Sequence, residues 1–381
     1  MNRRDFLRTT AGVGIAAAAP MINLGRVRLS AQSTAEYSTH AIDLVKSSLV
    51  VDMLHQIVYR IDQRDVLKRW LYQPGGFTDA DFDQYRRSGI SVINFGNGAA
   101  TYDAGIRLFG EFNGFIAGYP DWLMRVGRGT DFERAKSTGR LGILFGLQNS
   151  THFRTPDDVN TFYGLGQRVS QLTYNGANLI ADGAFEPRNG GLTEFGATLV
   201  ERMNQVGMAV DVAHAGDRTQ LDAFAHSKAP VIISHGNARA LNDGHPRCVS
   251  DESIRALARS GGAMGINFIS FMVKRREPVT VDDVIDHVDY VSKLAGIEHV
   301  GIGSDLGLES NDHADPGQFK RFMAAADPRY RIHKREVVEG LDHPLRFFTL
   351  TDALIRRGYS DDHIRLILGG NFRRVLSDIW R

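Results

Sequence analysis

Eight short apolar segments rich in β-branched residues alternate with helix-like segments along the chain, and this alternation constrains the fold more than any other feature. The expected strands are 49–53, 90–95, 141–147, 169–173, 208–213, 231–234, 263–268 and 300–304. Such continuous apolar runs are typical of parallel strands buried on both faces. Eight βα units in 381 residues predict an α/β fold, a (β/α)8 TIM barrel. A doubly wound open sheet is the alternative.

The segments between the strands carry helix boundary signals. Thr78, Thr193 and Ser250 each stand where a helix would begin, because their hydroxyls can cap free backbone N–H groups. Glycines stand where helices would end, at Gly89, Gly139, Gly207 and Gly261. Two longer irregular stretches, 176–192 and 309–343, are expected to be loops at the catalytic face of the barrel. The second is predicted to be a lid or an elaborated surface loop.

Two of the expected strands end in a histidine. They read Val210-Asp211-Val212-Ala213-His214 and Val231-Ile232-Ile233-Ser234-His235. Barrel enzymes keep their chemistry at the carboxyl ends of the strands, so the two imidazoles are predicted to share one site. A metal centre is the first hypothesis, and a pair of satisfied core histidines is the alternative.

Composition excludes several classes of function. Lys and Arg number 45 against 44 Asp and Glu, so the formal charge of +1 gives no footprint for nucleic acid or an anionic membrane. The single cysteine, Cys248, excludes an internal disulfide and a four-thiolate zinc site. A small molecule is therefore the expected partner.

The N-terminus reads as an export signal. Arg3-Arg4 precedes a weakly apolar Ala/Gly-rich stretch, which is typical of the twin-arginine route. We expect a leader over 1–31, a single barrel domain over 40–381, and a periplasmic or otherwise exported protein. The apolar run is too short to remain as a stable transmembrane anchor after processing.

The chain resembles the membrane (renal) dipeptidase family of zinc peptidases. The resemblance rests on the order and spacing of motifs such as Leu192-Thr193-Glu194-Phe195-Gly196, the two histidine strands, His245-Pro246-Arg247, Val300-Gly301-Ile302-Gly303-Ser304-Asp305 and Gly369-Gly370-Asn371-Phe372. It implies a metal-dependent, amidohydrolase-like barrel in which two zinc ions share a water that attacks the peptide bond of a dipeptide.

Carried over residue by residue, the resemblance implies roles for four positions. His214 and His235 match two zinc ligands, and Asp305 matches an aspartate that contacts the other zinc and handles the proton of the water. Arg247 matches the arginine that holds the substrate carboxylate, which suits a planar bidentate cation.

Other positions depart from the family pattern. Leu54 and Gln56 stand where the family has a ligating His and Asp, and Gln148 stands where it has a bridging Glu. Tyr174 replaces a histidine that supports the oxyanion, and with the adjacent Asn175 it is expected to contact substrate. A leucine cannot bind metal and an amide binds it poorly, so the resemblance predicts an incomplete two-metal site.

Three arrangements remain open. His55 could substitute for the missing ligand, although strand alternation turns it to the opposite face unless the strand bulges. One zinc or another divalent ion could be held by His214, His235 and Asp305. The barrel could instead hold no metal and act as a tailoring enzyme or binding protein for a small peptide-like compound. The leading prediction is metal-assisted cleavage of a dipeptide or a small amide, by a monomer or a homodimer.

Overall fold

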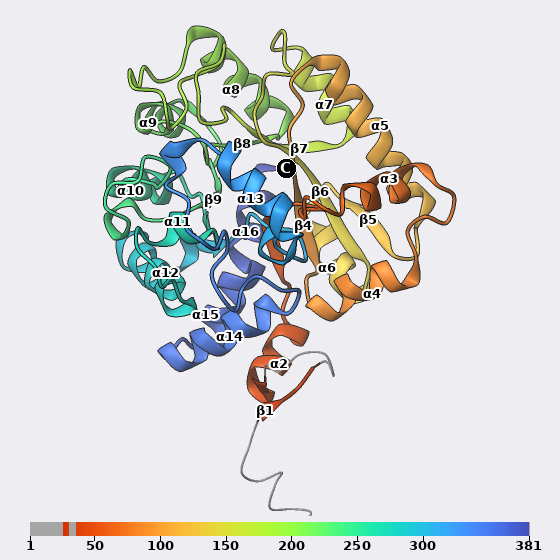
Figure 1. Ribbon diagram of the computed structural model, residues 1–381. Helices are drawn as coiled ribbons and strands as arrows, with labels where there is room; N and C mark the ends of the chain where they lie inside the picture. Colours follow the sequence, from red (N-terminus) through yellow and green to blue (C-terminus); the bar gives the residue numbers. More distant parts are fainter. Residues whose placement is uncertain (1–25, 30–35, 381) are drawn as a thin grey trace, which may run out of the picture.

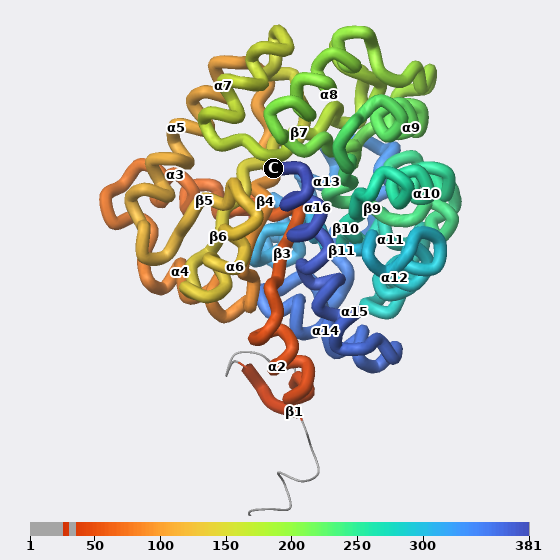
Figure 2. Tube along the Cα trace, turned by 180° about the vertical axis from the view of Figure 1, so that it is seen from behind, coloured from red at the N-terminus to blue at the C-terminus, as the bar shows by residue number. Residues whose placement is uncertain are grey.

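The computed structural model describes residues 26–29 and 36–380. The predicted leader lies largely outside these residues. Within them, no helix is long and apolar enough to cross a membrane. The chain forms a ring of strands surrounded by helices, with α13 over one end and α16 at the other (Figures 1 and 2).

All eight predicted strands are present in the described part of the chain. They are β3 (Val51–His55), β4 (Val92–Asn97), β6 (Leu141–Leu147), β7 (Gln167–Gln171), β8 (Ala209–Asp211), β9 (Ile233–Gly236), β10 (Met264–Ile266) and β11 (Val300–Ile302). Their boundaries differ from the predicted ones by a few residues. Three further strands lacked a sequence prediction, namely β1 (Arg26–Val27), β2 (Tyr37–Ser38) and β5 (Leu123–Val126).

The eight strands form a closed parallel barrel. One sheet has the order β3-β4-β6-β7-β8, and a second has the order β11-β10-β9. Single parallel bridges join the two sheets, Asp211 to Ile232 on one side and His55 to Leu306 on the other. The TIM barrel prediction is therefore confirmed, although both seams are narrow. The extra strand β5 pairs with the first half of β6, on residues Leu141 to Leu144.

The helices follow the strands in barrel order. They are α2 (Thr39–Ser47), α3 (Arg64–Tyr72), α4 (Asp79–Ser88), α5 (Tyr102–Gly118), α6 (Gly129–Thr138), α7 (Asp158–Leu165), α8 (Glu194–Val206), α9 (Asp217–His226), α10 (Asp251–Arg259), α11 (Ser270–Val273), α12 (Val281–Ala295), α13 (Pro316–Ala325), α14 (Arg346–Arg357), α15 (Asp361–Arg365) and α16 (Asn371–Ile379). Short helical turns are η1 (Arg239–Leu241), η2 (Ile297–His299), η3 (Asn311–His313), η4 (Pro328–Tyr330) and η5 (Leu366–Gly370).

The predicted helix boundaries agree with the observed caps. The hydroxyls of Thr78, Thr193 and Ser250 accept backbone N–H groups at the starts of α4, α8 and α10. Gly89 and Gly207 end α4 and α8 with φ of 79° and 80°, values that a side chain would disfavour. Local sequence therefore decides where these helices begin and end.

The barrel interior is apolar at one end and polar at the other. Phe372, Val375, Leu376 and Trp380 bring α16 into a buried cluster with residues from the strands and from α6. At the opposite end, the strands carry His214, His235 and Asp305. The long segment 309–343 follows β11 and lies over this polar end, with α13 in front of the barrel in Figure 1.

Candidate functional site

His214 and His235 face each other at the carboxyl ends of β8 and β9. Their Nε2 atoms lie 2.9 Å apart, and both residues are buried. Their pKa values lie well below the usual value, mainly because burial disfavours the charged ring and further because Arg247 is close. Both imidazoles are therefore neutral at physiological pH and can act as ligands.

A chain of hydrogen bonds from Asp211 fixes the proton on His235. The Ser234 hydroxyl donates to Asp211, so its oxygen can only accept from His235 Nδ1, which lies 2.9 Å away. Nδ1 consequently carries the proton, and the lone pair of Nε2 points into the site. Burial raises the pKa of Asp211 to about 6, while the Ser234 hydrogen bonds act in the opposite direction.

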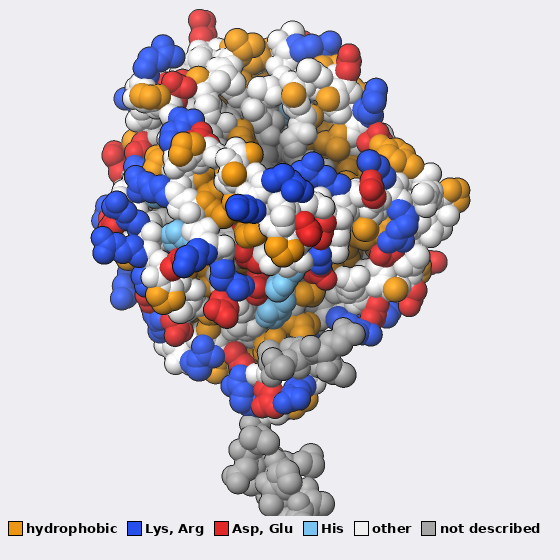
Figure 3. All heavy atoms as spheres, in the orientation of Figure 1, with side chains coloured by type: hydrophobic (Ala, Val, Ile, Leu, Met, Phe, Trp, Pro, Cys, Tyr) orange, Lys and Arg blue, Asp and Glu red, His pale blue; other side chains and the backbone are white. Residues whose placement is uncertain are grey.

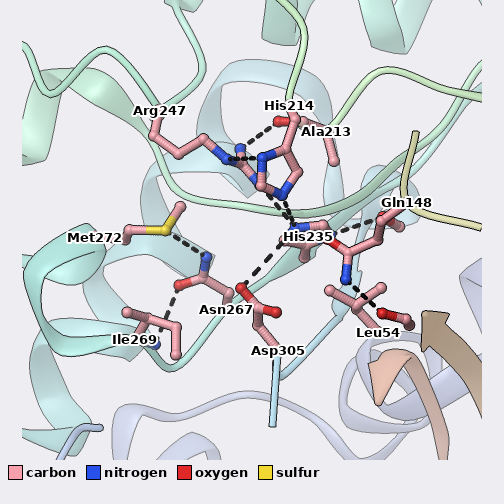
Figure 4. A network of polar contacts seen from close by, with 12 residues as sticks. Leu54, Gln148, Ala213, His214, His235, Arg247, Asn267, Ile269, Met272 and Asp305 are labelled. Carbon is pink, nitrogen blue, oxygen red and sulfur yellow. Dashed lines mark hydrogen bonds and ion pairs between the residues drawn. The ribbon is translucent and has the colours of Figure 1, made fainter. Parts of the chain in front are cut away.

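Arg247 inserts its guanidinium between the two histidines. It is 2% exposed, and its Nη2 lies 2.7 Å from His235 Nε2 while its Nε lies 3.0 Å from His214 Nδ1. Nη1 also donates to the carbonyl of Ala213. Figure 4 shows the three side chains pointing toward one another, with Asp305 below His235. A cation of the protein thus occupies the space beside the Nε2 lone pair.

Two groups compete for Nδ1 of His214. Asn175 Oδ1 lies 2.8 Å from it and requires a proton there, whereas Arg247 Nε requires a lone pair. With the proton on Nδ1, both histidines present Nε2 lone pairs to one point, as a metal ion requires. With the proton on Nε2, His214 donates to His235 and Arg247 completes the network. The site therefore alternates between a cation-accepting and a closed arrangement.

Asp305 supplies the carboxylate of the site. Its Oδ2 lies 3.9 Å from His235 Nε2, and its backbone has a φ of 64°, a left-handed conformation that is strained for a non-glycine residue. Burial raises the pKa of Asp305 to about 7, opposed by the nearby Arg247 guanidinium. A carboxyl group with this pKa can both accept and release a proton near neutrality.

In metal-free protein, Asp305 should make stability depend on pH. Because the folded carboxyl binds its proton more tightly than an unfolded one, its contribution to stability is lost as pH rises from about 4 to about 7. We expect Asp305→Asn to raise the free energy of unfolding at pH 8 by roughly 2 kcal/mol more than at pH 5. Denaturant titrations in a chelator test this, with exposed Asp121→Asn as the control. An equal effect of Asp305→Asn at both pH values would contradict it.

The three substituted positions lie together beside β4. A Cβ on Gly96 would meet Leu54 Cδ1 and Gln56 Nε2, each at 3.0 Å, and Gln148 Nε2 donates to the Gly96 carbonyl at 2.7 Å. In Figure 4, Leu54 and Gln148 lie on the far side of His235 from Arg247. The place of the first family metal is thus filled by an alkyl group and two amides.

His55 lies in another layer of the structure. The β3–β4 register shifts between Asp52 and His55, yet the ring stays fully buried, 3.2 Å from Asp52 Oδ2 and packed against Tyr85 of α4. The structure places it with these residues and not with the facing histidines. It therefore does not replace the missing ligand at Leu54.

The described residues do not fit a two-metal centre. They include no group of three or more His, Cys, Asp or Glu side chains placed to hold a metal ion. What remains is a pair of neutral imidazoles with one carboxylate nearby. Two divalent ions would share a single negative charge in a buried pocket, which is strongly unfavourable. This donor set suits at most one ion, and only when Arg247 withdraws.

Tyr174 and Asn175 form the rim of the site, as expected. The Tyr174 ring stacks on His214 with centroids 4.2 Å apart and is 46% exposed, so it borders both the histidines and solvent. Asn175 adopts a left-handed φ of 59° and donates to the hydroxyl of Tyr330. Tyr330 belongs to the segment 309–343, which accordingly reaches the site and forms part of its wall.

Sequence reasoning missed several residues of the site. Asp211 and Ser234 could have been noticed, because a polar pair inside buried strands is unusual. Tyr330 and Glu336 gave no local signal, since they lie far along the chain in an irregular segment. Glu336 accepts the hydroxyl of Tyr59 at 2.6 Å, and burial raises its pKa to about 7.

Comparisons with known proteins agree with this geometry. Residues 103–331 match the model of membrane dipeptidase, peptidase family M19. Dipeptidase verJ of Clonostachys rogersoniana is 33% identical over 267 residues, which cover 69% of this chain and 62% of the relative. The chain therefore spans about three fifths of the length of this curated relative.

Solved structures share the barrel. An amidohydrolase from Pseudomonas aeruginosa superposes with a TM-score of 0.75 at 28% identity, covering 89% of this chain and 99% of the other. A metallo peptidase from Rhodobacter sphaeroides, liganded with a phosphinate mimic of the dipeptide L-Ala-D-Ala, superposes with a TM-score of 0.71 at 17% identity, over 87% of this chain and 99% of the other. The latter likeness is one of fold alone.

Proposed function

Because the chain belongs to the membrane dipeptidase family, peptidase family M19, we propose that it hydrolyses the amide bond of a dipeptide or a related small peptide-like amide. The observation that carries the proposal is the convergence of His214, His235, Arg247 and Asp305 at the carboxyl ends of the barrel strands. Substrates of this kind carry a carboxylate, an amide carbonyl and an amine, and the site has a group suited to each.

Arg247 binds the substrate carboxylate in this proposal. Its guanidinium offers parallel N–H donors that match the two oxygens of a carboxylate. In the free protein, its partners are neutral nitrogens and the carbonyl of Ala213. An incoming carboxylate is therefore the stronger partner and draws the guanidinium away from the histidines.

Asp305 and Tyr174 act on the amide bond. The Asp305 carboxylate accepts a proton from the attacking water and passes it to the departing amine nitrogen, as its pKa of about 7 allows. The exposed Tyr174 hydroxyl donates a hydrogen bond to the carbonyl oxygen as negative charge develops there.

His214 and His235 would hold a single divalent ion, with Asp305 as the nearest carboxylate. Such an ion supplies a bound water of lowered pKa and polarises the amide carbonyl. One ion instead of two is favoured by the substitutions Leu54, Gln56 and Gln148. The twin-arginine sequence at Arg3-Arg4 supports a further proposal, that the protein is exported to the periplasm.

Metal content and dipeptide hydrolysis test the proposed function together. We expect protein purified without added metal to contain up to about one divalent ion per chain and to hydrolyse some members of a dipeptide panel. His235→Ala should lose both properties, because it removes a nitrogen ligand, whereas the surface variant His363→Ala should keep them. Absence of bound ion together with absence of hydrolysis across the panel would refute the proposal and favour a binding or tailoring role.

A further inference from the structure

A cleft of about 920 Å³ lies at the opposite end of the barrel from the histidines. It forms where the start of α6, the start of β7 and the end of α16 meet, on the side of the molecule that Figure 2 shows. Its lining includes Arg128, Arg168, Arg373, Tyr163 and Trp380. None of the residues proposed for amide hydrolysis lines this cleft.

The cleft is strongly basic for a protein of formal charge +1. An adjoining hollow shares Arg128 and Arg168 with it and adds Arg125 and Arg134. Together the two are lined by five arginines against the two carboxylates Asp131 and Glu133. Glu133 already pairs with Arg373 at 2.7 Å. Asp131 accepts the backbone N–H groups of Gly127 and Arg128.

Arg168 is the half-buried centre of this cluster. Its Nε donates to the Gly127 carbonyl at 3.1 Å, and its Nη1 donates to the carbonyls of Tyr163 and Gln167, each at 2.9 Å. Its guanidinium also lies over the Tyr163 ring, 3.8 Å from the centroid. No carboxylate of the described residues forms an ion pair with it. Burial and the neighbouring Arg125 and Arg128 guanidiniums lower its pKa.

Three guanidiniums in this arrangement repel one another. Arg125 donates to Asn113 at 3.0 Å, and neither it nor Arg128 has an acidic partner within the described part of the chain. Repulsion among like charges near a partly desolvated guanidinium costs free energy. An anion between them would remove that cost, and clusters of this kind commonly mark binding sites.

We propose that this cleft binds a compact divalent oxyanion, such as the phosphate group of a small phosphate monoester, at Arg125, Arg128 and Arg168. Guanidinium groups match the oxygens of phosphates and carboxylates through paired N–H donors. The body of the ligand would lie along Tyr163 and the aliphatic parts of the arginines. Trp380, buried beside the cleft, has an indole N–H without an acceptor among the described residues.

Calorimetric titrations of the full-length protein with phenyl phosphate, inorganic phosphate and succinate test the proposal. We expect one site of submillimolar Kd at 20 mM NaCl for at least one of them, weakened about tenfold at 200 mM NaCl because binding is electrostatic. Tighter binding of phenyl phosphate than of phosphate would support contact with Tyr163, and succinate bound as tightly as phosphate would identify dicarboxylates as ligands of the same site.

A pair of double variants locates the binding. Arg125→Gln/Arg128→Gln should weaken oxyanion binding at least tenfold, since both positions are exposed and their loss spares the core. Arg255→Gln/Arg259→Gln on α10 removes the same charge elsewhere and should leave Kd within twofold. Binding that persists in the first variant, equal losses in both variants, or no binding by any of the three anions below 10 mM would overturn the proposal.

Discussion

Restoring the three substituted positions, as Leu54→His/Gln56→Asp/Gln148→Glu, is expected to raise the metal content from about one to about two ions per chain and dipeptide kcat/KM by about 100-fold or more. The reason is geometric and electrostatic. The three side chains converge around Gly96 on one side of His235, and the changes add one imidazole and two carboxylates there. The added negative charge compensates a second ion.

A control variant separates ligation from simple polarity. Leu54→Asn/Gln56→Asn/Gln148→Met keeps similar side-chain sizes without new ligands and should bind no second ion. Metal analysis after dialysis and kinetics on a dipeptide panel provide the readouts. If the restored variant failed to gain an ion, the assignment of these positions would be wrong. If it gained the ion without faster hydrolysis, the pocket would serve a reaction other than dipeptide cleavage.

Replacing Arg247 is expected to change metal binding and catalysis in opposite directions. Arg247→Met should tighten binding of a divalent ion by about tenfold or more, because it removes a cation 2.7 Å from His235 Nε2. The same change should lower kcat/KM for dipeptides by about 100-fold or more, because the substrate carboxylate loses its bidentate partner. A merely structural role for Arg247 predicts losses of both.

Arg247→Lys is the matched control for this experiment. It keeps the positive charge and removes the planar fork, so metal affinity should stay near the wild-type value while dipeptide binding weakens. Competition with a chromophoric chelator measures the metal affinity, and steady-state kinetics separates KM from kcat. Unchanged metal affinity in Arg247→Met would show that the guanidinium does not compete with the ion.

The proposed reaction and the separate oxyanion cleft lie at opposite ends of one barrel. The first is carried by polar residues at the carboxyl ends of the strands, where βα loops converge. The second depends on arginines around α6 and β7. Figure 3 shows charges of both signs spread over the face seen in Figure 1. The basic cluster is therefore a local feature that the net charge of +1 does not reveal.

The sequence predicted the barrel because its strands and helices carry local signals. Apolar runs, Thr and Ser caps and helix-ending glycines act within a few residues, so strands such as β6 (Leu141–Leu147) could be placed from the sequence. The strand β5 (Leu123–Val126) and the helix α13 (Pro316–Ala325) were missed. Both are short and weakly patterned, and β5 depends on pairing with β6 to exist as a strand.

The sequence by itself also determined the chemistry available at the site. Two strand-end histidines, an aspartate after β11 and the substitutions Leu54, Gln56 and Gln148 were readable from position and residue type alone. Only the tertiary structure decided how these groups meet. Arg247 reaches His214 across 33 residues of sequence, and Ser234 links His235 to Asp211 across 23 residues. Local patterns encode which residues end a strand, whereas hydrogen-bond partners, burial and the resulting pKa values depend on contacts that form only when distant segments fold together.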